Sequence, residues 1–210
     1  MGKRLFDLAV ALPLLVVWSP VLVIVAILIK LDSPGPVFYL SERVGQGGRL
    51  YRSYRFRTMR VDVPAGVPPE SRLTRVGCAV RNVSLDHLPT LLNVVWGEMS
   101  LVGPRPMEPA RVELEDPAWQ RILTVRPGMV SWAIHCLGRE YNASSQALKK
   151  RLELEYVAKR SMGFDLWLLW SAGRALVASR GNVKARGRPL RGLDGRETRQ
   201  AGDGETARRG

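Results

Sequence analysis

The feature that most constrains this chain is a long uncharged segment near its N-terminus. Residues 8–29 carry no charged side chain, and as a straight helix they would measure roughly 33 Å, enough to cross the hydrocarbon core of a bilayer. A cleavable signal peptide is not expected, because the apolar run is too long and no small-residue cleavage motif follows it. Lys30 and the turn sequence of residues 31–36 follow instead. The segment therefore predicts a helix held in a membrane.

Two features set this segment apart from a simple spanning helix. Trp18-Ser19-Pro20 lies near its middle, where proline removes a backbone donor and a neighbouring serine can bond to the freed carbonyl. Lys3 and Arg4 flank one end and Lys30 the other, whereas spanning helices concentrate positive charge on one side. These residues are consistent with a kinked spanning helix and with a helix–break–helix hairpin that re-enters the same face. Taken alone, they favour the spanning helix slightly, because proline is common there.

The charge of the chain indicates an anionic partner. The formal net charge is +13 and the sequence pI is about 10.6. Nucleic acid, anionic lipid headgroups and phosphorylated small substrates all satisfy this condition. A membrane-anchored nucleic-acid-binding protein would concentrate its basic residues on one recognition helix with stacking aromatics, which is not evident here, so nucleic acid is not an expected partner. Residues 180–210 have almost no apolar side chains and are expected to form a disordered basic tail.

The rest of the chain predicts an α+β fold in which helices dominate. Residues 36–40 and 50–56 are rich in aromatic side chains, and the glycine cluster of residues 45–48 between them is a turn signal, so a small β-hairpin is expected. Ser84 is expected to cap a helix that holds Asp86 in its first turn, where anions are stabilised. Further helices are expected over residues 108–123, 145–160 and 164–177.

An arginine between two prolines and two tryptophans on the last expected helix are further candidate functional side chains. Pro104 and Pro106 enclose Arg105, and because prolines restrict the backbone, the guanidinium is expected on a stiff turn. The last helix is rich in tryptophan, and Trp167 and Trp170 suit either the headgroup level of a membrane, as on an amphipathic interfacial helix, or a core.

At this point the sequence resembles the small monotopic phosphoglycosyl transferases, bacterial sugar transferases that start glycan assembly on undecaprenyl phosphate. The resemblance covers residues 3 to about 176, and its motifs occur in the family order. They are Lys3-Arg4-Leu5-Phe6-Asp7, Ser19-Pro20, Ser33-Pro34-Gly35-Pro36-Val37-Phe38, Glu42-Arg43-Val44-Gly45, Tyr54-Arg55-Phe56-Arg57-Thr58-Met59, Thr74-Arg75-Val76-Gly77, Ser84-Leu85-Asp86, Leu88-Pro89, Asn93-Val94, Met99-Ser100-Leu101-Val102-Gly103-Pro104-Arg105-Pro106, Arg126-Pro127-Gly128, Gly138-Arg139 and Asp165-Leu166.

The resemblance implies a ping-pong transfer from a UDP-sugar to undecaprenyl (polyprenol) phosphate. A carboxylate nucleophile divides one difficult displacement between anions into two assisted steps. Mg²⁺ is the implied cofactor, because the diphosphate must be neutralised and this ion prefers oxygen ligands. The resemblance makes Asp86 the nucleophile and a metal contact, and gives Asp165 a role in supporting the site or the metal. Substrate binding falls to Arg105 with its flanking Pro104 and Pro106, and to Arg139, Arg55 and Arg57, although one of the last two suits an ordinary exposed strand charge better.

The sequence departs from the family at the residue after the nucleophile, where an acidic pair becomes Asp86-His87. Neutral imidazole can act as a base near pH 7 but is a poor magnesium ligand. His87 therefore either replaces the base or marks a catalytically silent relative that serves as a scaffold in glycan assembly.

The resemblance also reverses the order of the two membrane alternatives. It implies a re-entrant helix in residues 1–32, a cytoplasmic catalytic domain in residues 33–179, and a site at the cytoplasmic face of the bacterial inner membrane, in contact with membrane lipid. Downstream glycosyltransferases are potential partners.

Overall fold

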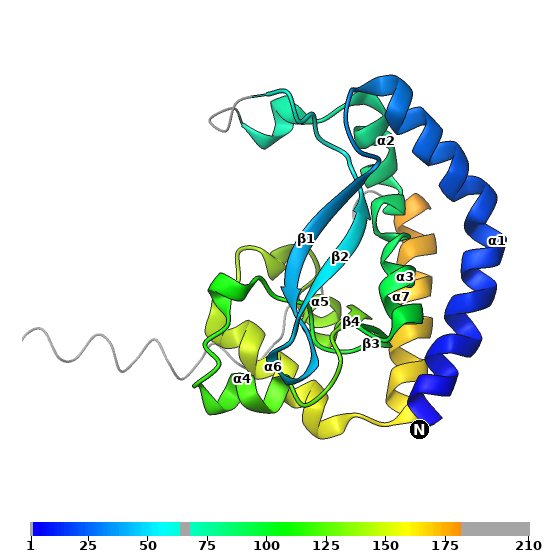
Figure 1. Ribbon diagram of the computed structural model, residues 1–210. Helices are drawn as coiled ribbons and strands as arrows, with labels where there is room; N and C mark the ends of the chain where they lie inside the picture. The colour runs from blue at the N-terminus through cyan, green and yellow to red at the C-terminus, as the bar shows by residue number, and fades with distance from the viewer. Residues whose placement is uncertain (1, 64–67, 182–210) are drawn as a thin grey trace, which may run out of the picture.

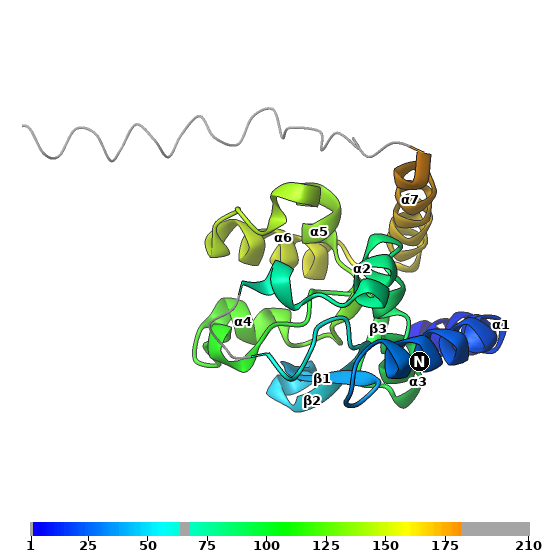
Figure 2. The same ribbon diagram turned by 90° about the horizontal axis from the view of Figure 1, so that it is seen from above.

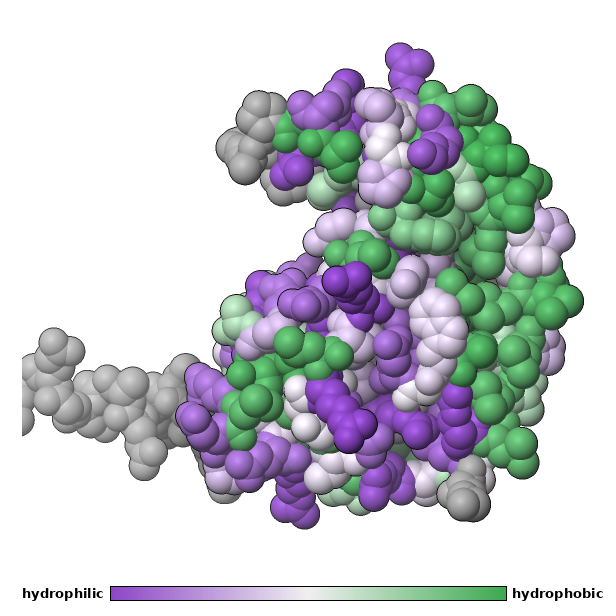
Figure 3. Space-filling model, in the orientation of Figure 1, coloured by the Kyte–Doolittle hydropathy of each residue, from purple (hydrophilic) through white to green (hydrophobic). Residues whose placement is uncertain are grey.

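The long apolar segment forms a single helix on the outer edge of the molecule. The computed structural model describes residues 2–63 and 68–181, so the loop at 64–67 and most of the expected basic tail lie outside it. Helix α1 (Gly2–Asp32) curves along one side of the body (Figure 1). It is long and apolar enough to cross a membrane by length and composition. Its outward side chains form the hydrophobic rim in Figure 3 and include Leu5, Leu12, Val16, Val17, Val23, Ile24, Ile27 and Leu31.

The expected break at Pro20 is wrong, because α1 is helical without interruption through both Pro13 and Pro20. A proline at position 20 leaves the carbonyl of Val16 without its usual donor. The Ser19 hydroxyl donates to this carbonyl at 2.8 Å, as its position beside the proline predicts. The freed carbonyl is therefore satisfied, and the chain passes the proline without leaving the helix. The re-entrant path through a membrane stays a prediction.

Both ends of α1 are attached to the same body. At the N-terminal end, Arg4 donates to the carbonyls of Val94 and Val95 (2.6 Å for the latter), where the C-terminal dipole of a helix favours a cation. At the other end, the Asp32 carboxylate accepts the backbone N–H of Val76 at 2.9 Å. Arg57 donates to the carbonyl of Ser33 at 2.8 Å. The middle of the helix carries most of the exposed apolar surface.

The predicted hairpin is confirmed. Strands β1 (Phe38–Val44) and β2 (Leu50–Phe56) pair antiparallel, with Phe38 opposite Phe56 and Val44 opposite Leu50. Gly47 and Gly48 have φ of 68° and 78°, so the turn between the strands needs residues that tolerate the left-handed region.

A second sheet was not foreseen from the sequence. Strands β3 (Ser100–Val102) and β4 (Gly128–Val130) form a short parallel pair. A Cβ atom on Gly128 would lie 2.0 Å from the Gly103 nitrogen, so only glycine permits this approach. Three residues per strand are too few to produce a recognisable alternation.

The remaining helices surround these strands. Viewed from above, the hairpin and the α5–α6 pair lie on opposite sides of the molecule, with α2 between them (Figure 2). The predicted helices at 145–160 and 164–177 are confirmed, whereas the one at 108–123 is reduced to a 3-10 turn and a short α4. The bounds are α2 Arg75–Asn82, α3 Thr90–Trp96, α4 Pro117–Ile122, α5 Trp132–Leu137, α6 Gln146–Lys159 and α7 Met162–Gly181.

The main core lies where α1, α3, α7 and both sheets meet. It contains Ala11, Tyr51, Leu91, Val94, Met99, Leu101, Val102, Tyr156 and Leu168. On α7, Leu168 is fully buried in this core, whereas Trp167 and Trp170 are 45% and 59% exposed. The two tryptophans therefore belong to the surface, which agrees with the first of the two alternatives for them but does not place them in a membrane.

Candidate active site

The turn that carries Asp86 differs from the predicted helix start. Ser84 has φ 57° and ψ 24°, in the left-handed region, and makes no capping hydrogen bond, so its predicted role as an N-cap is wrong. Pro89 has no N–H to donate to the Leu85 carbonyl, and the N–H of Leu88 takes that carbonyl at 3.1 Å instead. Residues 85–87 are thus one 3-10 turn, and α3 begins at Thr90.

Helix α3 fixes this turn against β2. Asn93, which is fully buried, accepts the Tyr54 N–H at 3.0 Å and donates to the Arg52 carbonyl at 2.7 Å. The Thr90 hydroxyl donates to the Tyr54 carbonyl at 2.9 Å. A side chain that bonds two backbone groups of one strand holds helix and strand in a fixed relation. Asp86, just before the helix, is thereby held beside Arg55 on the strand.

Asp86 and His87 form a close pair. His87 Nε2 lies 3.4 Å from Asp86 Oδ2. The Asp86 side chain is 14% exposed, and that of His87 is 48% exposed. The carboxylate is therefore mostly enclosed, whereas the imidazole beside it is half exposed.

Positive charges surround this pair. Burial is the main cause that lowers the pKa of the Arg55 guanidinium, and the positive charges of Arg43 and Arg105 lower it further. The negative charge of Asp86 acts in the opposite direction. Arg55 Nε is buried without a hydrogen-bond partner among the described residues. Buried donors are normally paired, so an unpaired one facing a carboxylate and other cations fits a site that receives an anion.

The imidazole of His87 responds to the same charges. Loss of hydration is the main factor that lowers the pKa of His87 below its ordinary value of 6.5. Arg55, Arg105 and Arg81 lower it further, and Asp86 acts in the opposite direction. His87 is therefore neutral at pH 7 and has a lone pair that can accept a proton.

Arg105 stands on the turn that follows β3, as the two prolines predict. The Pro104 carbonyl accepts the Gly128 N–H at 2.8 Å, which joins the turn to β4. The Arg105 guanidinium lies 4.8 Å from the centre of the Tyr141 ring, and Lys149 Nζ lies at the same distance from that ring. Arg139 is exposed and belongs to the same 3-10 turn as Tyr141, residues 138–141. Pro106 is half-buried beside these groups.

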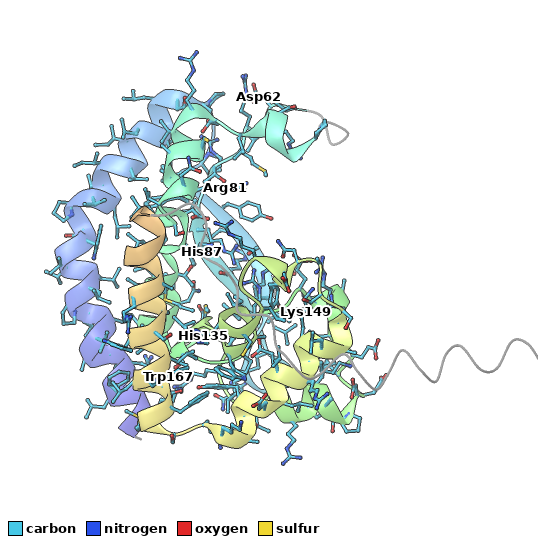
Figure 4. All side chains as sticks on the ribbon, turned by 180° about the vertical axis from the view of Figure 1, so that it is seen from behind. Asp62, Arg81, His87, His135, Lys149 and Trp167 are labelled. Carbon is cyan, nitrogen blue, oxygen red and sulfur yellow. The ribbon has the colours of Figure 1, made fainter. Side chains whose placement is uncertain are left out.

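The surface is hollowed on the side away from α1. Figure 3 shows this hollow between the part of the molecule that carries α2 and the part that carries α4 and α6. In Figure 4, Arg81 and His87 lie on one side of it and Lys149 on the other, while Asp62 stands at its outer rim. Basic side chains therefore lie on both sides of the hollow.

Two predicted site residues have other contacts. Arg57 is buried, and its guanidinium donates to Ser33 Oγ at 3.0 Å and to the carbonyls of Ser33 and Pro34, so it closes the C-terminal end of α1. Asp165 is also buried, with Oδ1 accepting from Tyr156 at 2.8 Å and Oδ2 from Lys3 at 2.5 Å. These contacts favour structural roles for both residues over substrate or metal binding.

The sequence interpretation missed several residues of the site. Arg43, Arg81, Tyr141, Lys149 and Asn93 all contribute, yet the sequence interpretation gave none of them a role in the site, although Asn93 lies in the family motif Asn93-Val94. Arg43 lies inside a family motif and Tyr141 follows Arg139 by two residues, so both motifs held a usable signal. Lys149 lies on an ordinary helix face and offered none.

The side chains near the site limit how the expected Mg²⁺ could be held. Within the described residues, no group of three or more His, Cys, Asp or Glu side chains lies close enough to hold a metal ion. Asp86 offers one carboxylate, which suits an ion that brings most of its ligands from phosphate oxygens and water.

The comparison with protein families decides the class of the protein. A family model described as bacterial sugar transferase matches residues 1–179. The chain belongs to this family.

Three relatives of this bacterial sugar transferase illustrate its range. UDP-N-acetylgalactosamine-undecaprenyl-phosphate N-acetylgalactosaminephosphotransferase of Aeromonas hydrophila is 34% identical over 187 residues, covering 85% of this chain and 44% of the relative. Exopolysaccharide production protein ExoY of Rhizobium meliloti (strain 1021) is 34% identical over 203 residues, covering 87% and 88%. UDP-glucose:undecaprenyl-phosphate glucose-1-phosphate transferase of Escherichia coli (strain K12) is 35% identical over 178 residues, covering 80% and 38%. The chain thus spans less than half of two relatives and most of ExoY.

Proposed function

We propose that this protein transfers a sugar 1-phosphate from a UDP-sugar to undecaprenyl phosphate, as the first membrane step of exopolysaccharide assembly. The observation that carries the proposal is a mostly enclosed carboxylate, Asp86, among the guanidinium groups of Arg55, Arg105 and Arg81. The names of the relatives support the two substrates and the pathway class. The identity of the sugar is left open.

In the first half-reaction, Asp86 acts as nucleophile. A carboxylate oxygen bonds to the β-phosphorus of the UDP-sugar, the bond from that phosphorus to the bridging oxygen breaks, and UMP leaves. The sugar phosphate is then held on Asp86 as an acyl phosphate. Arg55 and Arg105 offset the charge that makes attack of one anion on another slow.

In the second half-reaction, an oxygen of undecaprenyl phosphate attacks the same phosphorus and the bond to Asp86 breaks. The neutral imidazole of His87 accepts the remaining proton of the lipid phosphate, which makes that phosphate a better nucleophile. Its distance of 3.4 Å from Asp86 supports a place beside the reacting phosphorus. His87 thus takes the position and the task that an acidic residue has in the family.

Magnesium fits the site as an ion shared with the substrate. Asp86 would hold it on the protein side, with diphosphate oxygens and water completing the shell. When bound, the ion supplies neutralisation of the diphosphate charge. Asp165 adds no ligand in this proposal, because Lys3 and Tyr156 already engage both of its oxygens.

The position of α1 supports a membrane-bound enzyme with both ends of the helix at one face. Residues 1–32 would be the membrane segment and residues 33–179 the catalytic domain. A helix whose two ends bond to one body cannot carry one end across a bilayer while the body stays outside. Its exposed apolar middle would enter the lipid from the cytoplasmic side of the inner membrane. The site would then meet both the water-soluble nucleotide sugar and the lipid phosphate, and hand its product to downstream glycosyltransferases.

The test is a screen of UDP-sugars with undecaprenyl phosphate, magnesium and the purified protein in detergent. Release of UMP and formation of a lipid-linked sugar phosphate are expected with one or a few sugars. Without the lipid, intact mass should rise by one sugar phosphate. If the protein releases no UMP with any UDP-sugar and gains no mass, the proposed transferase activity is refuted and the scaffold alternative is left.

A further inference from the structure

A buried carboxyl group lies beneath the turn that carries Arg105. Glu153, on α6, is only 4% exposed. Its Oε1 accepts the backbone N–H of Arg105 at 3.0 Å and the hydroxyl of Ser131 at 2.7 Å. Nothing in the sequence marked this residue, because a glutamate on a charged helix is ordinarily solvated.

These two bonds join three parts of the site. Ser131 is the N-cap of α5 and accepts the N–H of Ile134 at 3.3 Å, so its hydroxyl proton is free to go to Glu153. Glu153 therefore connects α6 to the beginning of α5 and to the turn after β3. The side chain of Arg105 is held from the same side, because Tyr141 follows α5 and its ring lies under the guanidinium.

This arrangement lowers the stability of the folded protein. Glu153 Oε2 is buried and has no hydrogen-bond partner among the residues that the structure describes. Burial also raises the pKa of Glu153 to about 7. An apolar side chain of similar volume in this place would stabilise the protein more than a half-paired carboxyl does. What the carboxyl supplies, and an apolar side chain does not, is an acceptor for the Arg105 N–H.

We infer that Glu153 is a positioning residue of the active site, which fixes the Pro104-Arg105-Pro106 turn so that the Arg105 guanidinium faces Asp86 and His87. The inference rests on the proposed function, because it concerns the arginine that receives the diphosphate. Glu153 itself does not touch the substrate. It acts through the backbone of Arg105, and Tyr141 completes the placement through the side chain.

A double-mutant cycle tests this inference. Glu153→Leu fills the volume without an acceptor, so it should keep the fold while releasing the turn. We expect kcat/KM for the UDP-sugar to fall on the order of 10- to 100-fold, the usual effect of losing one hydrogen bond to a charged group. Glu153→Gln keeps an acceptor oxygen and should stay within about threefold of the wild type. Glu155→Gln, on an outer face of α6 beside Lys159, is the matched control and should change nothing.

The decisive comparison is made without the guanidinium. In an Arg105→Ala background, assayed with radiolabelled UDP-sugar, Glu153→Leu should lower the remaining rate by less than about threefold, because there is no guanidinium left to position. The same loss in both backgrounds would mean that Glu153 only supports the fold, and would overturn the inference.

If Glu153→Leu fails to fold, Glu153→Ala takes its place in the cycle. A wild type that releases no UMP would remove the proposed function and this inference together, whereas an additive cycle in an active enzyme removes the inference alone.

Discussion

His87 Nε2 lies 3.4 Å from Asp86 Oδ2, so two residues adjacent in sequence present a carboxylate and an imidazole to the same space. Both residues belong to the 3-10 turn of residues 85–87, in which the Leu85 carbonyl accepts the Leu88 N–H at 3.1 Å. A nucleophile and a base for the same phosphorus need this proximity.

Asp86→Asn should abolish both UMP release and the gain of mass with UDP-sugar. A carboxamide cannot form the acyl phosphate, and it leaves the surrounding arginines in place. Intact mass spectrometry with and without undecaprenyl phosphate measures the effect. Asp62→Asn, at an exposed pair with Arg60, is the matched control and should react like the wild type. A phosphosugar adduct on the Asp86→Asn protein would place the nucleophile elsewhere.

His87 should act as a base that works below the usual range of histidine. Because the pKa of His87 is lowered from 6.5, the imidazole stays neutral as pH falls through 6.5, and kcat should decline only at lower pH. His87→Ala should remove this acid limb and lower kcat by about 10²- to 10⁴-fold. The measurement is a pH profile of saturated turnover.

The other histidine gives the control for this profile. His135 stacks on Trp132 at 5.6 Å, in the aromatic cluster of α5 and α7, and His135→Gln should leave the acid limb unchanged. If His87→Ala is harmless and His87→Glu raises activity, the histidine marks a weakened site and not a replacement base.

The parts of this structure that follow from local sequence were predictable. Aromatic strands and a glycine turn predicted the hairpin, and the amphipathic pattern of residues 145–160 predicted α6. Its cap was not predicted: the Ser145 hydroxyl accepts the Leu148 N–H at 3.2 Å. The start of α3 was not predicted, because the missing N–H of Pro89 outweighs the capping preference of Ser84. Asp86 itself was identified from the family resemblance alone, since an acidic residue near a helix start is otherwise unremarkable.

Roles that depend on distant contacts could not be read from the sequence. Asp165 was assigned to the metal because it is acidic and occurs in a family motif, but Lys3, 162 residues earlier, neutralises it. Arg55 lies on β2 and Arg57 directly follows that strand, yet Arg57 donates to the end of α1, whereas Arg55 interacts electrostatically with Arg105 and Asp86. Residues two apart on a strand point to the same face, so the alternation in the sequence offered no reason to separate these arginines; they part because β2 ends at Phe56.

Lys3→Met should destabilise the protein without changing its need for magnesium. The change leaves the buried Asp165 carboxylate without its cation, and because the Lys3 side chain is 40% exposed, we expect a loss of about 2 kcal/mol in the free energy of unfolding. Adding Asp165→Asn should recover much of this loss. Thermal unfolding in detergent and the magnesium dependence of turnover are the two measurements. A raised magnesium requirement in Asp165→Asn would instead identify Asp165 as a metal ligand.

Both ends of α1 should be inaccessible from the periplasm. Single cysteines replace Gly2 and the exposed Glu42 in a background without Cys78 and Cys136, the free cysteines of the described chain. A membrane-impermeant maleimide should label neither site in intact spheroplasts and both after permeabilisation, because each end of the helix is bonded to the same body. Labelling of Gly2→Cys alone in intact spheroplasts would show that α1 spans the membrane.

Glu153→Gln should change how stability depends on pH. The folded state raises the pKa of Glu153 from 4.5 to about 7, so it binds this proton more tightly than the unfolded chain does. The contribution of Glu153 to stability is therefore complete below pH 4.5 and is lost as pH rises toward and through 7. At pH 8 this loss has an upper limit of about 3 kcal/mol.

Glutamine does not ionise, so the variant should gain stability relative to the wild type between pH 5 and pH 8. Unfolding temperatures of both proteins at these two pH values, with Glu155→Gln as control, measure the difference. Parallel curves for Glu153→Gln and the wild type would mean that Glu153 titrates in its ordinary range and is hydrated in the folded protein.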